Sequence, residues 1–156
     1  MKTTANNLST INIMGFACPK IKKTARLVAQ QALNLLGQAP VELTIKFVSP
    51  KQIRRLNANF RQTDRVTDVL SFPSFDVKVG ELVPTAADNP SYLGDMAICL
   101  KQTKRQAKEY GNTNCQEVKK LVIHSVLHML GYDHIKDEDY LVMNSKEIDL
   151  DKQIQL

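Results

Sequence analysis

The sequence predicts an α+β fold in which a small mixed four-stranded sheet packs with about five helices in a single domain, residues 1–156. Three observations lead to this prediction. Strand-like and helix-like patterns interleave along the chain, which is typical of a layered domain of this class. The chain has no internal repeat, and its 43% hydrophobic and 24% charged residues are the balance of an ordinary globular domain. A chain of 156 residues can also bury a sizeable core without disulfide bonds.

The first half of the chain predicts the order strand, helix, strand, helix, over residues 8–16, 19–36, 41–48 and 50–60. Apolar residues recur at helical spacing in the first helix, and Gly37 is a suitable cap for its end. The second strand, VELTIKFV, alternates apolar and polar residues, as a half-buried strand does. Ser49 is a favourable N-cap and Pro50 suits the first position of the second helix.

The second half predicts strands over residues 66–72 and 92–100, and helices over residues 101–110, 114–130 and 137–151. The segment 76–90 contains Gly and Pro without a clear period, so we expect a loop or a loose hairpin there. Either Thr113 or Asn114 can cap the long helix, and Glu117 is placed for a capping box with Asn114.

Cysteine content and hydropathy predict a cytoplasmic protein that does not enter a membrane. Cys18, Cys99 and Cys115 are widely spaced and odd in number, which argues against a disulfide framework and a thiolate zinc cluster; we expect all three to be buried thiols. No apolar run approaches the roughly 18 residues of a membrane span, and the N-terminal residues do not resemble a signal peptide.

Positive charge is concentrated in two segments, although the net charge is only +5. Residues 46–61 carry five basic residues and no acidic one, and residues 101–120 carry six basic residues against two acidic ones. Such segments can bind the phosphates of a nucleic acid. On charge alone, however, solvated helix faces are the favoured interpretation.

All three histidines of the chain lie in one short window, His124-Ser-Val-Leu-His128-Met-Leu-Gly-Tyr-Asp-His134. His124 and His128 would lie about 40° apart on one helix face, one turn apart along the axis. Gly131 can end the helix and turn the chain back, which brings His134 toward the same point. Three histidines leave the fourth tetrahedral position of a zinc ion open to water, as in catalytic zinc sites. We therefore predict one Zn²⁺ per chain at these three residues.

A structural role for the same histidines is the alternative. The remaining residues of this helix are mostly apolar, which predicts that the helix is buried. Buried imidazoles need partners, so His124 and His128 could instead bond to carbonyl groups, with His134 an unrelated loop residue.

The residue after the first histidine bears on the reaction. The spacing matches the ligands of the zinc-protease pattern HExxHxxGxxH, but Ser125 stands where a protease keeps its glutamate base. A serine cannot accept the proton from zinc-bound water as a carboxylate does, so the sequence disfavours a metalloprotease.

Three separate elements resemble the YbeY family of endoribonucleases, over residues 43–148. HSVLHMLGYDH at 124–134 is similar to the family's H-G-x-L-H-L-x-G-Y-D-H, with Ser125 and Met129 as small departures. Residues 57–73 resemble N-x-x-F-R-x-x-D-x-x-T-D-V-L-S-F-P, and Leu93-Gly94-Asp95 resembles the family's L-G-D-I strand. Met143 and Glu147 fit its M-x-x-x-E tail.

The resemblance implies a zinc-dependent endoribonuclease, specific for single-stranded RNA, that acts in small-subunit (16S) rRNA processing and ribosome quality control. It implies His124, His128 and His134 as zinc ligands and Arg61 as the functional arginine. The implied partners are single-stranded RNA, rRNA precursors and the small ribosomal subunit. Zinc lowers the pKa of its bound water toward 7, so a metal-bound hydroxide needs no glutamate base, and an arginine can stabilise charge on the phosphate.

Two other interpretations stay open. The chain could be a non-catalytic ribosome-assembly factor that binds RNA through its basic segments and holds a structural zinc. A metalloprotease is the other, less favoured one. Asp133 could orient a metal ligand or form a turn, whereas Asp68 and Asp95 are expected to make local hydrogen bonds without a catalytic role. The oligomeric state does not follow from the sequence.

Overall fold

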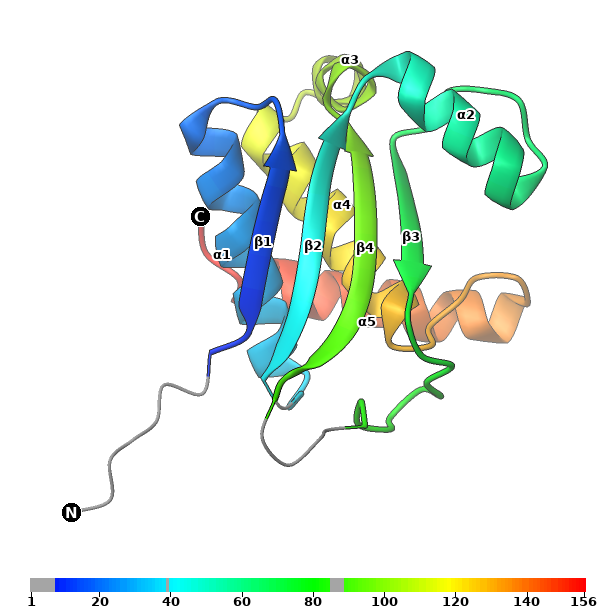
Figure 1. The fold of residues 1–156 in the computed structure, drawn as a ribbon. Helices are drawn as coiled ribbons and strands as arrows, with labels where there is room; N and C mark the ends of the chain where they lie inside the picture. Colours follow the sequence, from blue (N-terminus) through cyan, green and yellow to red (C-terminus); the bar gives the residue numbers. More distant parts are fainter. Residues whose placement is uncertain (1–7, 39, 85–88) are drawn as a thin grey trace.

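A computed structural model describes residues 8–38, 40–84 and 89–156 and confirms the predicted α+β class (Figure 1). Four strands and five helices occur in these residues, in the predicted order. They are β1 (Thr10–Gly15), α1 (Pro19–Leu35), β2 (Val41–Val48), α2 (Pro50–Arg61), β3 (Val69–Pro73), β4 (Ser91–Cys99), α3 (Leu100–Tyr110), α4 (Asn114–Met129) and α5 (Asp137–Gln153).

The sheet is mixed, as predicted, and has the strand order β1-β2-β4-β3. Strands β1, β2 and β4 run parallel, and β3 pairs antiparallel with β4 at the edge. Alternation in β2 buries Val41, Leu43, Ile45 and Phe47, while Lys46 of the same strand is exposed. One face of the sheet therefore supplies the core.

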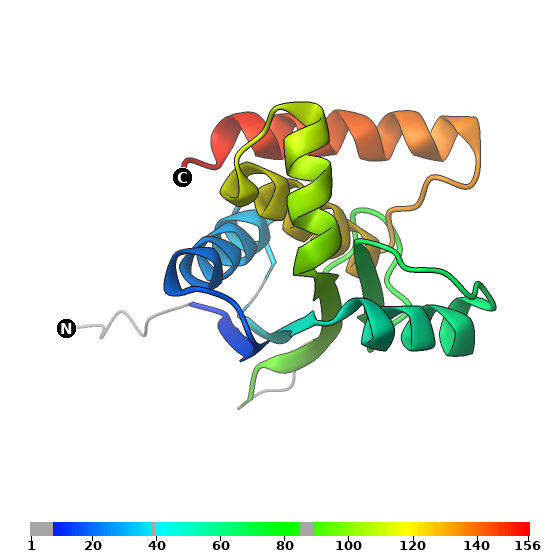
Figure 2. The same cartoon turned by 90° about the horizontal axis from the view of Figure 1, so that it is seen from above.

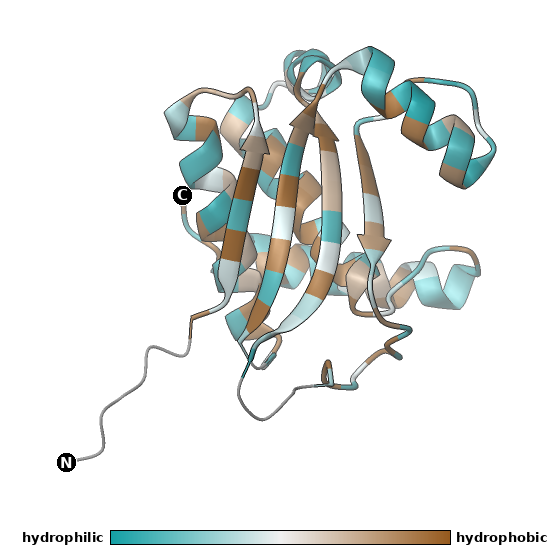
Figure 3. Ribbon diagram, viewed as in Figure 1, coloured by the Kyte–Doolittle hydropathy of each residue, from teal (hydrophilic) through white to brown (hydrophobic). Residues whose placement is uncertain are grey.

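Helices α1, α4 and α5 lie on that face, with α4 between the sheet and α5 (Figures 1 and 2). Much of α4 is hydrophobic (Figure 3), and Val118, Val122, Val126 and Leu127 have no exposed surface. Burial of this apolar surface is the main stabilising contribution that α4 makes to the fold. The prediction that the histidine-bearing helix is buried is confirmed.

Helix α2 packs at the β3 edge of the sheet. Its Ile53 joins Leu70 of β3 and Cys99 of β4 in a second, smaller apolar cluster. The helix starts at Ser49, whose hydroxyl accepts a hydrogen bond from the Gln52 N–H in a capping box. This packing carries the last residue of α2, Arg61, to the side of β3.

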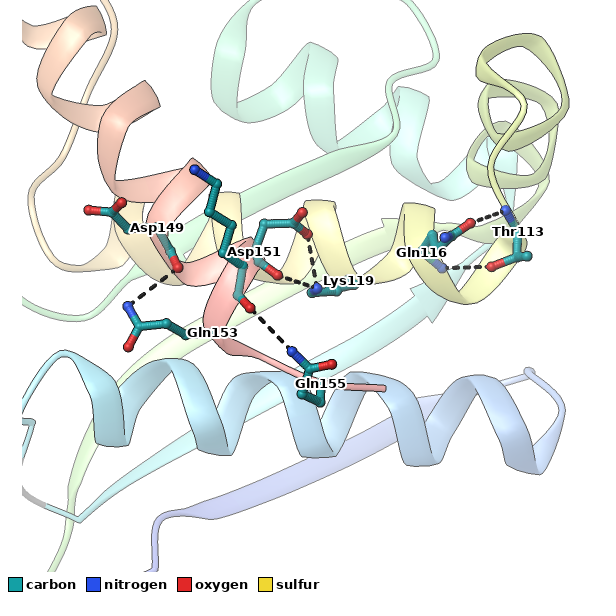
Figure 4. A network of polar contacts seen from close by, with 8 residues as sticks. Thr113, Gln116, Lys119, Asp149, Asp151, Gln153 and Gln155 are labelled. Carbon is teal, nitrogen blue, oxygen red and sulfur yellow. Dashed lines mark hydrogen bonds and ion pairs between the residues drawn. The ribbon is translucent and has the colours of Figure 1, made fainter.

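The cap of α4 differs from the capping box predicted with Asn114 and Glu117. Thr113 is the N-cap, and its reciprocal partner is Gln116 (Figure 4). Glu117 is buried instead, and its carboxylate accepts a hydrogen bond from the side chain of Asn112. The chain thus starts the helix one residue earlier than a box with Glu117 would require.

Three other predictions need correction or comment. The third strand begins at Val69 rather than residue 66, because the Asp68 carboxylate accepts a hydrogen bond from the Val69 N–H where the strand begins. Cys18 is exposed and Cys115 is half-buried, so only Cys99 is the buried thiol expected; all three are free. Residues 76–84 form no strand, and 85–88 lie outside the described residues.

None of the helices described is long and apolar enough to span a membrane.

Candidate metal centre

Helix α4 places His124 and His128 one turn apart on a face that is only partly buried. After Met129 the helix ends in a Schellman motif: Tyr132 N–H donates to the Leu127 carbonyl, and Gly131 N–H donates to that of His128. Gly131 has φ +90°, and a Cβ there would overlap the carbonyl oxygen of Val77. Glycine is therefore required at the turn that returns the chain toward the two histidines.

The turn brings His134 to the other two rings, as the spacing predicted. One ligand atom from each of the three side chains lies within 4.8 Å of the other two. The Nε2 atoms of His124 and His128 are 3.0 Å apart. Ring centroids of His134 lie 5.6 Å from His124 and 5.0 Å from His128. The three histidines are thus positioned to hold one metal ion.

Hydrogen bonds at the Nδ1 atoms orient two of these rings. His124 Nδ1 lies 2.5 Å from a carboxylate oxygen of Glu147, and His128 Nδ1 lies 2.9 Å from the carbonyl oxygen of Tyr132. Each acceptor favours the tautomer with the proton on Nδ1, which leaves the Nε2 lone pair free for a metal. The alternative interpretation, in which the histidines bond to carbonyl groups, holds only for Nδ1 of His128. The Nε2 atoms of His124 and His128 instead point toward each other.

The donor set fits zinc. Imidazole nitrogen is a ligand that Zn²⁺ prefers, at about 2.0–2.1 Å, and three histidines with one open position are a known catalytic arrangement. Tetrahedral geometry at that bond length sets neighbouring nitrogens about 3.3–3.4 Å apart, close to the His124–His128 separation. A carboxylate behind one ligand, as Glu147 lies behind His124, is a common support of zinc sites.

Electrostatics keep one predicted ligand deprotonated in the metal-free protein. Burial, and to a smaller extent the neighbouring rings of His124 and His134, lower the pKa of His128 to about 4; the Tyr132 carbonyl and Glu147 oppose this in part. His128 is thus neutral at pH 7, the form that binds metal.

Ser125 does not face the histidine cluster. Its side chain is fully buried, and its hydroxyl lies 2.6 Å from the hydroxyl of Ser71 on β3. The residue next to the first predicted ligand therefore joins α4 to the sheet. Glu147 cannot replace the missing protease base either, because its carboxylate binds the Nδ1 side of His124, away from the Nε2 atoms.

Arg61 lines the same cleft as the three histidines. The cleft has a volume of about 570 Å³ and also contains residues 67–71 and Asp133. One guanidinium nitrogen of Arg61 donates a hydrogen bond to the carbonyl oxygen of Ser71, at 2.9 Å. A guanidinium has five N–H donors, so this anchor leaves others for an anion in the cleft.

The three aspartates considered from the sequence make local hydrogen bonds. Asp133 accepts from the Ile135 N–H, the turn role that was one of its two alternatives. Asp68 accepts from the Thr67 hydroxyl and the Val69 N–H. Asp95 accepts from the hydroxyl of Tyr92 on the same strand.

The role of Glu147 was missed in the sequence, although the residue was noted in the tail motif. The available signal was its spacing: Met143, one turn earlier on α5, is a core residue at 2% exposure, so Glu147 lies near the same inward face. The bond from His128 to the Tyr132 carbonyl could not be predicted from the sequence, because every residue has a backbone carbonyl.

Comparison with known proteins gives a consistent result. A model of the family described as Endoribonuclease YbeY matches residues 5–155. The chain belongs to this family. It is 41% identical over 134 residues to Endoribonuclease YbeY of Finegoldia magna, covering 86% of this chain and 80% of that protein. The identity to the same-named protein of Caldicellulosiruptor saccharolyticus is 42% over 129 residues, covering 79% of this chain and 82% of that one.

A solved structure supports the fold. The solution structure of TM1509 from Thermotoga maritima matches with a TM-score of 0.64 and 26% identity, covering 93% of this chain and 89% of that chain. The family resemblance and the α+β fold predicted from the sequence are both confirmed.

Proposed function

We propose that the chain is a zinc-dependent endoribonuclease that cleaves single-stranded RNA, with His124, His128 and His134 holding one zinc ion and Arg61 binding the scissile phosphate. The observation that carries the proposal is the convergence of three imidazoles beside an anchored arginine in one cleft. Family membership supplies the class of reaction, because the relatives are named endoribonucleases.

Each group at or beside the three histidines has a role in the proposed phosphodiester cleavage. Zinc, when bound, supplies Lewis-acid polarisation of a phosphoryl oxygen and water of lowered pKa at neutral pH. Glu147 and the Tyr132 carbonyl hold the imidazoles of His124 and His128 in orientation. The free donors of Arg61 bind the phosphate oxygens on which negative charge builds, with the Ser71 carbonyl limiting how far the guanidinium moves.

Charge on two helices supports an RNA substrate. The exposed face of α3 carries Lys101, Lys104, Arg105 and Lys108, at the spacing that puts residues on one face. Exposed basic residues also line α2, from Lys51 to Arg61, which lies in the cleft. Like charges at this spacing destabilise a helix slightly, and a bound polyanion would offset that cost.

We further propose that the substrates are precursors of small-subunit rRNA, that the partner is the small ribosomal subunit, and that the protein acts in the cytoplasm. The resemblance of the motifs at 57–73 and 124–134 to the YbeY family supports these assignments. Charged α2 and α3 faces equally suit a ribosome-assembly factor that binds RNA without cleaving it, so the test must separate the two.

The decisive experiment pairs elemental analysis of purified protein with RNA cleavage before and after chelation. We expect one zinc per chain, cleavage of single-stranded RNA that stops on zinc removal, and recovery when zinc is restored. His124→Ala and His128→Ala should lose zinc and activity together, whereas Arg61→Ala should keep zinc and lose activity. Full cleavage by metal-free protein would overturn the proposal, and RNA binding without cleavage by the zinc form would favour the assembly factor.

A further inference from the structure

A second cavity, of about 830 Å³, adjoins the histidine cleft and has no task in the function proposed above. It lies between α3, α4, α5 and the start of β3. Asp68, Val69 and His124 line both spaces, so the cavity opens beside the first predicted zinc ligand. Its volume is within the range of ligand pockets for small molecules and nucleotides. An RNA strand in the histidine cleft would meet this cavity next to the phosphate that is cleaved.

The lining offers flat apolar contacts. Leu121 and Ile123 of α4 contribute buried side chains, at 7% and 2% exposure. Tyr110 at the end of α3 and Tyr140 on α5 also line the cavity, and they are 62% and 52% exposed. Proteins that bind single strands use such aromatic side chains as platforms on which bases stack. The side-chain amide of Asn144 adds donors and an acceptor that can meet a base edge.

Two lysine side chains of the lining can contact an anionic ligand. Three acidic residues line the cavity, but each is already engaged: Asp68 with the Val69 N–H, Glu147 with His124, and Asp151 with Lys119 at 3.1 Å (Figure 4 shows the last pair). The lining also contains Lys120 and Lys152, which are exposed and form no salt bridge within the described part of the chain. Two ammonium groups without partners suit a phosphate.

We propose that this space, the tyrosine–lysine cavity, binds one unstacked nucleotide of the RNA adjacent to the cleavage site. Tyr110 and Tyr140 contact its base, and Lys120 and Lys152 contact its phosphate. A base can enter only when it is neither paired nor stacked in a helix, because in a duplex its faces are covered. The inference rests on the proposed function and deepens it, since it gives the preference for single strands a structural origin.

The test compares variants of zinc-loaded, full-length protein on a fluorescent single-stranded RNA and on the same RNA in a duplex. We expect Tyr110→Ala/Tyr140→Ala to raise KM about 10-fold or more with little change in kcat. Stacking on the two rings contributes to RNA binding and not to the chemical step, so its loss affects binding alone. The ratio of single-strand to duplex cleavage should fall with it. Tyr110→Phe/Tyr140→Phe keeps the rings and should behave like the wild type. Lys120→Gln/Lys152→Gln should raise KM several-fold and reduce its salt dependence.

Matched control variants come from the N-terminal part of the chain, whose residues do not line the cavity. Phe16→Ala removes an aromatic ring that is 95% exposed, and Lys20→Gln/Lys23→Gln removes two exposed charges of α1. Both controls should keep the wild-type KM. Zinc content must match in all variants. An unchanged KM in the tyrosine double variant, with active wild-type protein, overturns the inference.

A binding arm separates this inference from the proposed function. The chain has four tyrosines and no tryptophan, so tyrosine emission can report stacking of a base. Titration of zinc-loaded protein with adenosine 5′-monophosphate should quench emission in the wild type. The tyrosine-to-alanine variant lacks the two reporting rings, so calorimetric titration compares the two proteins, and the variant should bind at least about 10-fold more weakly. This result would support the cavity even if no RNA were cleaved. Equal binding by both proteins would overturn it.

Discussion

His124 on α4 and Glu147 on α5 lie 2.5 Å apart through Nδ1 and a carboxylate oxygen, although 23 residues separate them in the chain. The contact ties the last helix to the candidate metal centre. It also fixes which nitrogen of His124 is free, since the proton on Nδ1 is held by the carboxylate. Helix α5 therefore belongs to the site and not only to the packing of α4.

Replacing Glu147 should weaken metal binding without removing a ligand. We expect Glu147→Ala to lower zinc affinity about 10–100-fold, because the His124 ring loses its orienting acceptor and its negative partner. Glu147→Gln keeps an acceptor and loses the charge, so its effect should be smaller. Competition with a chelating dye measures both. Glu138→Gln, an exposed change on the same helix, is the control; wild-type affinity in the alanine variant would show that the contact does not support the metal.

Metal-free protein should lose stability as the pH falls from about 6.5 toward 4. The pKa of His128 in the folded state is about 4, below its ordinary value of 6.5, chiefly because the ring is buried. Below pH 6.5 the unfolded chain therefore takes up a proton that the folded chain does not, and unfolding becomes easier. Urea unfolding of chelated protein between pH 7.5 and 4.5 measures the effect. The fall should be shallower in His128→Gln, and equal slopes would contradict the prediction.

Much of the fold could be predicted because it depends on local patterns. The alternation in residues 41–48, the Ser49-Pro50 helix start and the glycine after His128 each fix backbone structure within a few residues. The cap of α4 was misjudged because Thr113 with Gln116 and Asn114 with Glu117 satisfy the same rule. Burial of Glu117 against Asn112 decides between them, and that is a property of the folded state.

The candidate site also has one part that the sequence predicted and another that depends on the tertiary structure. His124, His128 and His134 come together through one helix and one turn, so their spacing was sufficient to predict the cluster. Contacts across the fold were not accessible: the Glu147 carboxylate comes from α5, and Arg61 reaches the cleft because α2 packs against β3. The resemblance pointed to Arg61, but only the tertiary arrangement shows what anchors it.

The buried hydroxyl pair of Ser71 and Ser125 should contribute to stability and not to metal binding. Ser125→Ala leaves the Ser71 hydroxyl without its partner in the core, which should cost about 1–3 kcal/mol of unfolding free energy. Ser71→Ala/Ser125→Ala removes both polar groups and should cost less than the single change. Chemical denaturation of the zinc form measures the energies. Zinc content should stay at the wild-type level in both, and loss of zinc in Ser125→Ala would place its hydroxyl in the metal site after all.

Gly131 offers a direct test of how the turn builds the histidine cluster. An alanine there would place its Cβ against the Val77 carbonyl oxygen while holding φ at +90°, so the turn must shift and His134 with it. We expect Gly131→Ala to destabilise the protein by more than about 1 kcal/mol and to lower zinc affinity. Gly111→Ala is the matched control: Gly111 has φ +70° at the end of α3, but its Cβ would meet nothing within 4 Å. That variant should show the backbone cost alone and keep zinc affinity unchanged. If Gly131→Ala bound zinc as tightly as Gly111→Ala does, the return of His134 would not depend on this turn.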